Sequence, residues 1–338
     1  MTALSSATAV KHYRAYRCHE LGHYNELVID SLPAITPRAN EIVIANRAFS
    51  VGFPEYLMIR GEYQLKPPLP FVPGMECSGE VIAVGDGVSQ FRPGEKVFGS
   101  TRVGAYAEQV VIAVENCLAL PDTFDFAAGA SYLAAYKTAF VGLVERGSLK
   151  KGETLLVHGA AGGVGLAAVE LGKLLGATVI GTGSNAGKLA VVKEKGADHV
   201  IDLSLGGFRE EVKALTDGRG ADVIFDPVGG DIFDESMRCI ATFGRLLVIG
   251  FAGGRIPTLA VNYALIKQVS VVGVRAGEYG RVKPEAGARV LDSLMQLARE
   301  GQLSPHIYKR YRFTELAAAF DDLVARRVIG RAVVEIES

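Results

Sequence analysis

The residues best suited to a chemical role lie between His158 and Gly165, in the sequence His-Gly-Ala-Ala-Gly-Gly-Val-Gly. A short apolar run precedes glycines at positions 159, 162 and 165, and an apolar segment of helical length follows. A strand, a tight turn and a helix in this order present unpaired backbone N–H groups and the positive end of a helix dipole to an anion. The glycine spacing therefore predicts a site for the diphosphate of a dinucleotide. A glycine-rich turn without a ligand is the alternative for the triplet taken alone.

The sequence after this loop favours the binding site. A strand over 177–181 follows the first helix at the distance expected of a βαβ unit. Further helices and strands are then expected to alternate over 185–196, 199–203, 208–216, 221–226, 231–241 and 245–250. Such alternation predicts a doubly wound parallel sheet, that is, a Rossmann fold. Within the loop we expect the cofactor contacts to come from Gly159, Ala161, Gly162, Gly163 and Val164.

Composition limits the remaining possibilities. The chain has 338 residues and a formal net charge of −1, so two domains are expected and no basic field for nucleic acid or an anionic membrane is evident. Cysteines stand alone at positions 18, 77, 117 and 239, which suits a reducing cytoplasm. Residues 1–10 are read as a disordered tail rather than a signal peptide, and no apolar run reaches transmembrane length.

The chain is expected to divide into two domains. Residues 11–130 contain short strand candidates interrupted by glycine and proline, which predicts an irregular β domain. Residues 131–275 form the nucleotide-binding domain, and residues 276–338 are expected to return to the first domain. An alanine-rich helix candidate within 126–147 joins the two.

Several motifs carry a family resemblance. They are Phe71–Gly79, Val84–Val88, Phe91–Val97, the loop from Gly152 to Gly165, Asp226–Gly230 and Ile249–Phe251. With these motifs the chain resembles the medium-chain dehydrogenase/reductase superfamily, in its zinc-independent quinone oxidoreductase (zeta-crystallin-like) branch. The resemblance implies a GroES-like domain joined to a Rossmann domain, and an NADPH-dependent reductase. Glu170 stands where this branch usually has Gln, which we interpret as a surface or helix-packing change.

No metal site is expected. Zinc-dependent relatives carry a metal-binding His in a Gly-His-Glu motif, and Met75 occupies that position here. A thioether is a poor ligand for Zn²⁺, and the six histidines show no ligand spacing. Without zinc, alcohol oxidation is not expected, whereas reduction of a small electrophilic acceptor needs only a positioned hydride and a proton.

The choice of nicotinamide cofactor depends on the end of the second strand. Sites for NAD place a carboxylate there to bind the ribose 2′-hydroxyl, but this chain has Gly183 and Ser184, followed by Lys188. Lys188 is either a ligand of a 2′-phosphate or a solvated helix residue, and the family resemblance favours the ligand and therefore NADPH. The resemblance also places Arg326 near this phosphate, although Leu203 stands where some relatives have Tyr.

The nicotinamide ring is expected in the crevice between the domains. Thr138 resembles a family threonine beside the ring, and the alternative is a hydroxyl bonded to its own helix. Phe251, Ala252 and Val274 are expected to line the ring pocket from strand ends.

The acceptor pocket is assigned to residues 52–63. Gly52 and Glu55 replace an Asn and an Asp that relatives usually have, and Tyr56 is a further pocket candidate. Tyr63 matches a tyrosine proposed as the proton donor in related enoyl-thioester reductases, and a packed loop aromatic is the alternative.

Three functions stay open at this point. They are an NADPH-dependent quinone reductase, an NADPH-dependent reductase of activated C=C bonds (2-enoyl thioesters, enones or acrylates), and an NADPH-binding structural or sensor protein. The apolar, β-branched run Val269–Val274 is expected to form the sheet edge and to pair two copies as a homodimer.

Overall fold

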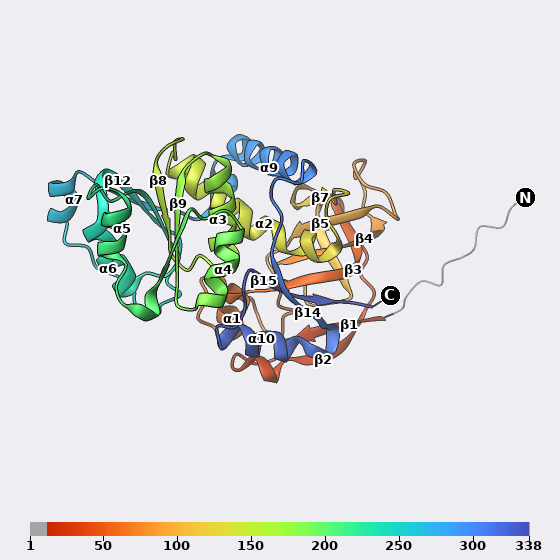
Figure 1. The fold of residues 1–338 in the computed structure, drawn as a ribbon. Coiled ribbons are helices and arrows are strands. Elements are labelled where there is room, and N and C mark those ends of the chain that lie inside the picture. Colours follow the sequence, from red (N-terminus) through yellow and green to blue (C-terminus); the bar gives the residue numbers. More distant parts are fainter. Residues whose placement is uncertain (1–11, 338) are drawn as a thin grey trace, which may run out of the picture. The chain divides into compact units, whose positions relative to one another are not determined.

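The computed structural model describes residues 12–337, so the tail predicted for residues 1–10 lies outside the described part. Contacts divide the chain into two compact units (Figure 1). The antiparallel unit contains the described residues up to Ser131, then Lys309–Arg327, and those from Ala332 onward. The parallel unit contains Tyr132–Tyr308 and Val328–Arg331.

The parallel unit is built on a six-stranded, fully parallel sheet with the order β10-β9-β8-β11-β12-β13. Its strands are β8 (Thr154–Val157), β9 (Thr178–Gly183), β10 (His199–Asp202), β11 (Ala221–Asp226), β12 (Ile240–Val248) and β13 (Ser270–Gly273). Strand order reverses between β8 and β11, and ligands of doubly wound sheets bind at the carboxyl ends of strands beside such a reversal. The predicted doubly wound sheet is therefore confirmed.

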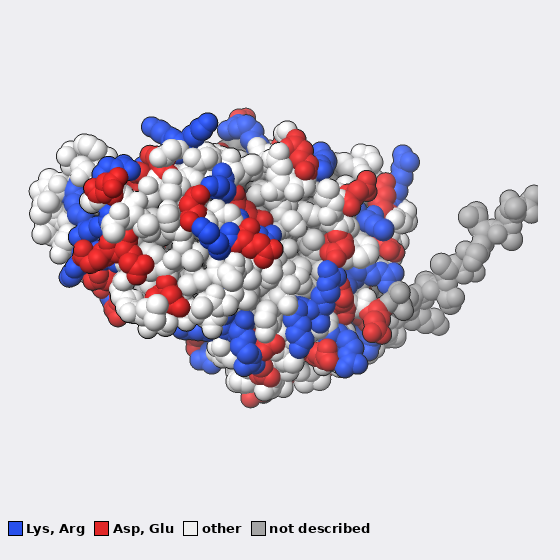
Figure 2. Space-filling model, in the orientation of Figure 1, with Lys and Arg blue, Asp and Glu red and all other residues white. Residues whose placement is uncertain are grey.

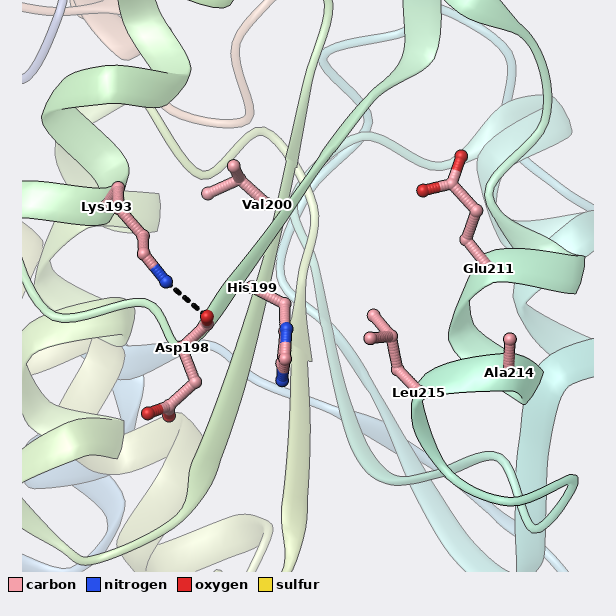
Figure 3. A pocket seen from close by; sticks show the side chains of 7 residues that line it. All are labelled: Lys193, Asp198, His199, Val200, Glu211, Ala214 and Leu215. Carbon is pink, nitrogen blue, oxygen red and sulfur yellow. Dashed lines mark hydrogen bonds between the residues drawn. The ribbon is translucent and has the colours of Figure 1, made fainter.

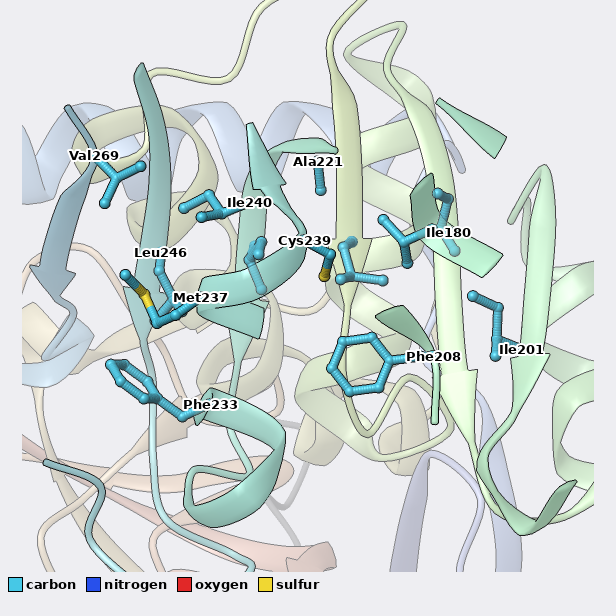
Figure 4. Packing of buried hydrophobic residues seen from close by; sticks show 13 residues of the cluster. Ile180, Ile201, Phe208, Ala221, Phe233, Met237, Cys239, Ile240, Leu246 and Val269 are labelled. Atoms are coloured by element: carbon cyan, nitrogen blue, oxygen red, sulfur yellow. The ribbon is translucent and has the colours of Figure 1, made fainter. Parts of the chain in front are cut away.

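Helices connect these strands, and the sheet is covered by side chains on both faces. The connecting helices are α3 (Gly163–Leu174), α4 (Ala186–Glu194), α5 (Arg209–Leu215), α6 (Gly230–Cys239) and α7 (Asn262–Lys267). All four residues of β8 are buried, which explains why the sequence shows an unbroken apolar run there. Figure 4 shows the core against α5 and α6, where Phe208 and Phe233 pack among strand residues such as Ile180 and Leu246.

The long helix α2 (Phe126–Phe140) continues into a π-helical turn, η3 (Val141–Arg146). Two more helices follow β13, namely α8 (Ala276–Val282) and α9 (Pro284–Arg299). The sequence placed residues 276–338 with the first domain, but residues 276–308 belong to the parallel unit. The buried Tyr132 hydroxyl donates to the carbonyl oxygen of Leu294 at 2.8 Å, and the apolar face of α9 is buried through Val290 and Leu294.

The antiparallel unit contains a seven-stranded sheet with the order β14-β15-β3-β4-β5-β7, and β6 pairs with β3. These strands are β3 (Glu41–Val51), β4 (Glu76–Val84), β5 (Lys96–Ser100), β6 (Gln109–Ala113), β7 (Cys117–Ala119), β14 (Ile307–Arg312) and β15 (Arg331–Glu335). A hairpin of β1 (His12–Arg17) and β2 (Val28–Pro33), with helices α1 (Phe53–Ile59) and α10 (Leu316–Val324), completes the unit. Strand β15 pairs antiparallel with β3, so this final part of the chain does return to the first sheet.

A polar cluster inside the parallel unit joins four segments around Glu170 of α3. The Tyr136 hydroxyl donates to the Glu170 carboxylate, and Lys195 Nζ donates to it at 2.8 Å and to the Ser304 carbonyl oxygen at 2.8 Å. The Glu170 and Lys195 side chains are only 12% and 20% exposed. Of the two interpretations of Glu170, the helix-packing change therefore fits and the surface change does not, because the carboxylate lies inside the packing of α2 and α3.

Burial raises the pKa of Glu170, while the bonds from Lys195 and Tyr136 oppose that rise. A carboxyl whose pKa is raised by folding contributes stability below its unfolded pKa and loses it as pH rises through the folded pKa. We therefore expect the free energy of unfolding of the wild type, relative to Glu170→Gln, to fall as the pH rises above the ordinary pKa of a glutamate, about 4.3. Denaturant unfolding at several pH values measures this difference. The exposed Glu211→Gln variant controls for loss of one charge, and a pH-independent difference for Glu170→Gln would contradict the expectation.

Candidate cofactor site

The glycine loop after β8 packs too closely for a side chain at its last position. A Cβ atom on Gly165 would lie 2.3 Å from the carbonyl oxygen of Gly159. Gly162 is the N-cap residue of α3 and supplies no side-chain cap, so the first turn of the helix presents its backbone N–H groups without a side-chain competitor. Gly163 and Val164 occupy this first turn. The loop therefore has the geometry that an anionic diphosphate requires.

The loops after β11 and β12 lie beside each other at the same end of the sheet. Buried Asp226 closes the first of these loops by accepting the N–H groups of Val228 at 2.8 Å and Gly229 at 2.9 Å. The N–H of Ala252 then donates to the carbonyl oxygen of Pro227 at 3.0 Å, which places Phe251 and Ala252 at this loop. Phe251 and Ala252 are exposed, as residues available to a ligand would be.

Val274 follows β13 at the same end of the sheet. Its N–H donates to the carbonyl oxygen of Val248 at 3.0 Å, and the residue is buried. The structure thus gathers most residues assigned to the cofactor at the carboxyl ends of β8, β11, β12 and β13.

The end of β9 carries the residues assigned to the 2′-phosphate. Ser184 is exposed, and the Asn185 side chain caps α4 by accepting the N–H of Lys188 at 3.1 Å. Lys188 Nζ donates to the carbonyl oxygen of Val328 at 3.3 Å. Lys188 is therefore a partly buried, oriented cation, not a solvated helix residue.

The carbonyl at position 328 belongs to the segment just after Arg326, which the family resemblance placed near the 2′-phosphate. The N–H of Gly330 donates to the Ala161 carbonyl oxygen at 2.8 Å, and Gly162 and Gly330 form a parallel bridge. Gly330 has a φ of 66°, and its ideal Cβ would lie 2.1 Å from the His306 carbonyl oxygen. The contact of this segment with the glycine loop itself had no sequence signal beyond a lone glycine before the last strand, which is compatible with many turns.

Two cofactor assignments are less directly supported. The Thr138 hydroxyl donates to the Ala134 carbonyl oxygen of its own helix at 2.6 Å, which is the alternative considered from the sequence. It can meet a ligand only by accepting a hydrogen bond. Arg326 lies just after α10 in the antiparallel unit, with a φ of 55°, and its role stays a prediction.

The residues assigned to the acceptor belong to the antiparallel unit and surround α1. Gly52 is the buried N-cap residue of this helix and supplies no side-chain cap. The Tyr56 ring lies 5.7 Å from that of Phe53 and 6.1 Å from that of Tyr24, between ring centroids. Tyr63 is half-buried in the loop that follows. The structure brings Gly52 and Tyr56 together on one helix, and the role of Tyr63 stays a prediction.

The charge pattern and the cavities of the described residues add little to this site. Figure 2 shows Lys, Arg, Asp and Glu interspersed on the face in view. A cavity of about 360 Å³ includes Lys193, His199 and Glu211 (Figure 3), but His199 begins β10 and so lies at the amino ends of the strands, away from the glycine loop. Among residues 12–337, no three His, Cys, Asp or Glu side chains are grouped so that they could hold a metal ion.

Comparison with known proteins places the chain in a family. Residues 38–122 match the alcohol dehydrogenase GroES-like domain, and residues 163–292 match the zinc-binding dehydrogenase family. A quinone oxidoreductase-like protein 2 homolog of Nematostella vectensis is 36% identical over 97% of this chain and 90% of its own length. The chain belongs to the quinone oxidoreductase-like proteins of the medium-chain dehydrogenase/reductase superfamily. The GroES-like and Rossmann fold class expected from the sequence is thereby confirmed, and the protein is an oxidoreductase.

Two further members of this family are informative. A quinone oxidoreductase of Pseudomonas aeruginosa is 35% identical over 88% of this chain and 92% of its own length. A mycobacterial protein whose structure was solved as a complex with NADPH is 30% identical, covers 95% of this chain and 99% of its own, and has a TM-score of 0.87.

The packing of Gly330 gives a testable expectation. Gly330→Ala forces a side chain into a left-handed conformation and against the His306 carbonyl, whereas Gly152→Ala has a comparable φ of 84° and open space around its Cβ. We expect Gly152→Ala to cost about 1–2 kcal/mol of unfolding free energy from backbone strain alone. Gly330→Ala should cost about 2 kcal/mol more, because the displaced carbonyl loosens the segment against the glycine loop. Denaturant unfolding measures both variants, and equal losses would contradict this packing.

Proposed function

We propose that this protein transfers hydride from NADPH to a quinone without the help of a metal ion. The observation that carries the proposal is made where β9 leads into α4. This connection has no carboxylate at the position where NAD-binding sites have one. Lys188, in the first turn of α4, instead donates to the Val328 carbonyl oxygen. A lysine ammonium at this position attracts the 2′-phosphate that distinguishes NADPH from NADH. The mycobacterial relative in complex with NADPH and the relatives named quinone oxidoreductases support the same function.

The residues of the parallel unit fit such a cofactor. The first turn of α3 offers N–H groups to the diphosphate, and Ser184 and Lys188 offer a hydroxyl and a charge to the 2′-phosphate. Exposed Phe251 and Ala252 offer apolar surface for the nicotinamide, which supplies the hydride when bound, whereas Val274 is buried at this end of the sheet. In this proposal the protein binds, orients and desolvates the reactants, because quinone reduction needs no strong acid.

Proton delivery separates quinones from the alternative acceptor class. Hydride transfer to a quinone leaves a hydroquinone anion, which can take its proton from water. Hydride transfer to a 2-enoyl thioester, enone or acrylate leaves an enolate, for which the phenol of Tyr63 would be a suitable donor. The half-buried position of Tyr63 just after α1, beside Gly52 and Tyr56 in sequence, supports this reductase as the second candidate function.

A homodimer is also proposed, with a second copy pairing along β13. This strand forms one edge of the six-stranded sheet and carries Val271, which is 40% exposed. Beside it in the chain, Val261, Leu265 and Ile266 of the α7 region are between 72% and 79% exposed. An open strand edge next to exposed apolar side chains favours association by strand pairing.

The cytoplasm is the proposed location. Cys18, Cys77, Cys117 and Cys239 are all unpaired, which fits a reducing compartment. No helix within residues 12–337 is long and apolar enough to cross a membrane.

Cofactor preference tests the assignment of Lys188. We expect Lys188→Ala to raise the KM for NADPH roughly 10- to 100-fold, because a hydrogen bond to a charged group is lost, and to leave the KM for NADH nearly unchanged. The matched control is Lys193→Ala, an exposed lysine of the same helix. Initial rates with both cofactors measure the effect. A wild type that prefers NADH, or equal losses for both cofactors, would argue against a 2′-phosphate site.

Acceptor preference tests the reaction. With NADPH we expect turnover of 1,4-benzoquinone and 9,10-phenanthrenequinone, and slower turnover of crotonyl-CoA and a simple enone. Tyr63→Phe should leave the quinone rates unchanged, because their proton comes from water, and should lower any alkene rate roughly 100-fold or more. Alkene turnover that exceeds quinone turnover and depends on Tyr63 would establish the alternative. A wild type that binds NADPH but reduces no acceptor would contradict both activities.

Assembly is tested by charge insertion. We expect the wild type to sediment as a dimer at micromolar concentrations and Leu265→Asp to sediment as a monomer, because a buried unpaired charge opposes association. Leu205→Asp is the control, since Leu205 is 87% exposed in the turn after β10. A monomeric wild type, or a Leu265→Asp dimer as stable as the wild type, would exclude this interface.

A further inference from the structure

His158 lies between β8 and the first glycine of the loop, and its side chain is completely buried. Both ring nitrogens have a hydroxyl partner. Nδ1 lies 2.9 Å from Oγ1 of Thr182 on β9, and Nε2 lies 2.8 Å from Oγ of Ser236 on α6. The ring also packs against Phe208, with centroids 4.7 Å apart. A buried imidazole with two polar partners is held in one orientation.

The hydrogen-bond pattern fixes the tautomer of this ring. The Ser236 hydroxyl donates to the carbonyl oxygen of Ile232 at 2.7 Å, and a carbonyl can only accept. The single hydroxyl hydrogen of Ser236 is thus committed, so Nε2 of His158 must donate to Ser236. The neutral ring then accepts the hydroxyl hydrogen of Thr182 at Nδ1. Burial lowers the pKa of His158 to about 3, which keeps the ring neutral.

His158 connects β8, β9 and α6, and each of these elements adjoins a loop of the proposed cofactor site. The N–H of His158 donates to the Phe225 carbonyl oxygen at 3.0 Å, and the N–H of Ala160 donates to the Thr182 carbonyl oxygen at 3.0 Å. Thr182 precedes the turn that holds Ser184 and Lys188, and Ser236 lies on α6, which follows the Asp226 loop. The imidazole therefore braces the end of β8 against the end of β9 and against α6.

A direct chemical role does not fit this residue. No atom of the His158 side chain reaches the surface, and each ring nitrogen is already engaged by a buried hydroxyl. Proton transfer to a bound acceptor would require breaking one of these bonds inside the core.

We propose that His158 is a positioning residue that fixes the distance between the turn for the diphosphate and the turn for the 2′-phosphate of NADPH. The identity of the ligand rests on the proposed function. The brace, by which we mean the two hydrogen bonds of His158 to Thr182 and Ser236, rests on the observed contacts alone. The affinity for a ligand that spans both turns depends on the distance between them. The affinity for a ligand that occupies only one turn does not. This difference distinguishes positioning from a general effect on stability.

Binding measurements use that difference. NADPH spans both turns, and adenosine 2′-monophosphate reaches only the turn at Ser184 and Lys188. We expect His158→Phe, which removes both hydrogen bonds but keeps an aromatic ring, to weaken NADPH binding on the order of 10- to 100-fold. Binding of adenosine 2′-monophosphate should change less than about threefold, since its turn keeps its own bonds.

Conservative variants guard against a fold defect. His158→Gln keeps a donor and an acceptor, so it should recover part of the NADPH affinity that His158→Phe loses. Thr182→Val removes one hydrogen bond without changing side-chain shape, so it should weaken the binding of NADPH but not that of adenosine 2′-monophosphate. The control is His199→Phe, at an exposed histidine that begins β10. Titration calorimetry on the full chain gives both dissociation constants. Unchanged NADPH binding in all three site variants, or equal weakening of both ligands, would overturn the inference.

Nitrogen NMR of ¹⁵N-histidine-labelled protein tests the brace without any ligand. The expected signature is a neutral ring with hydrogen on Nε2 that does not titrate between about pH 5 and about pH 8. A ring with hydrogen on Nδ1, or one that titrates in this range, would contradict the bonding pattern. If the wild type fails to bind NADPH while this signature is present, the proposed cofactor is wrong and the brace stands.

Discussion

The close approach of α3 to the loop that precedes it is the constraint on which the cofactor site depends. With the carbonyl oxygen of Gly159 at 2.3 Å from an ideal Cβ at position 165, the helix can start where it does only without a side chain. That start decides where the free N–H groups of the first turn point. The proposed site for a diphosphate is thus made of backbone, and side chains act on it mainly by holding backbone segments in place.

Side chains and segments from distant parts of the chain supply that support. Gly330 bonds to Ala161 and brings the Val328 carbonyl to Lys188, so the segment before the last strand orients the cation at the other end of the site. Glu170 fixes the far side of α3 through Lys195. Each contact is polar and at least partly buried, so a polar group that lost its partner there would be left without full compensation from water.

The sequence predicted what local patterns can encode. Glycine spacing and the alternation of apolar segments located the parallel sheet and the loop from Gly159 to Val164, because a turn and its flanking elements involve adjacent residues. It could not predict that Gly330 meets Ala161, since nothing local distinguishes this glycine from one in any other turn. It also misplaced residues 276–308, because the helical spacing of α9 shows that a face is buried but not against which unit. The partners of Glu170 and His158 come from separate elements, and only the fold brings them together.

The division of the chain separates two kinds of specificity. The residues proposed to decide between NADPH and NADH, namely Ser184 and Lys188, belong to the parallel unit, whereas those proposed for the acceptor, Gly52, Tyr56 and Tyr63, belong to the antiparallel unit. Gly52 is an N-cap without a side chain, so a change there alters one end of α1 and leaves the contacts of Lys188 and His158 untouched. In the proposed arrangement, acceptor preference can therefore change through the first turn of α1 while the residues proposed for the cofactor keep their contacts. We interpret the departure from relatives at Gly52 and Glu55 as a change of this kind, because both residues lie at the start of α1, which carries the proposed acceptor residues.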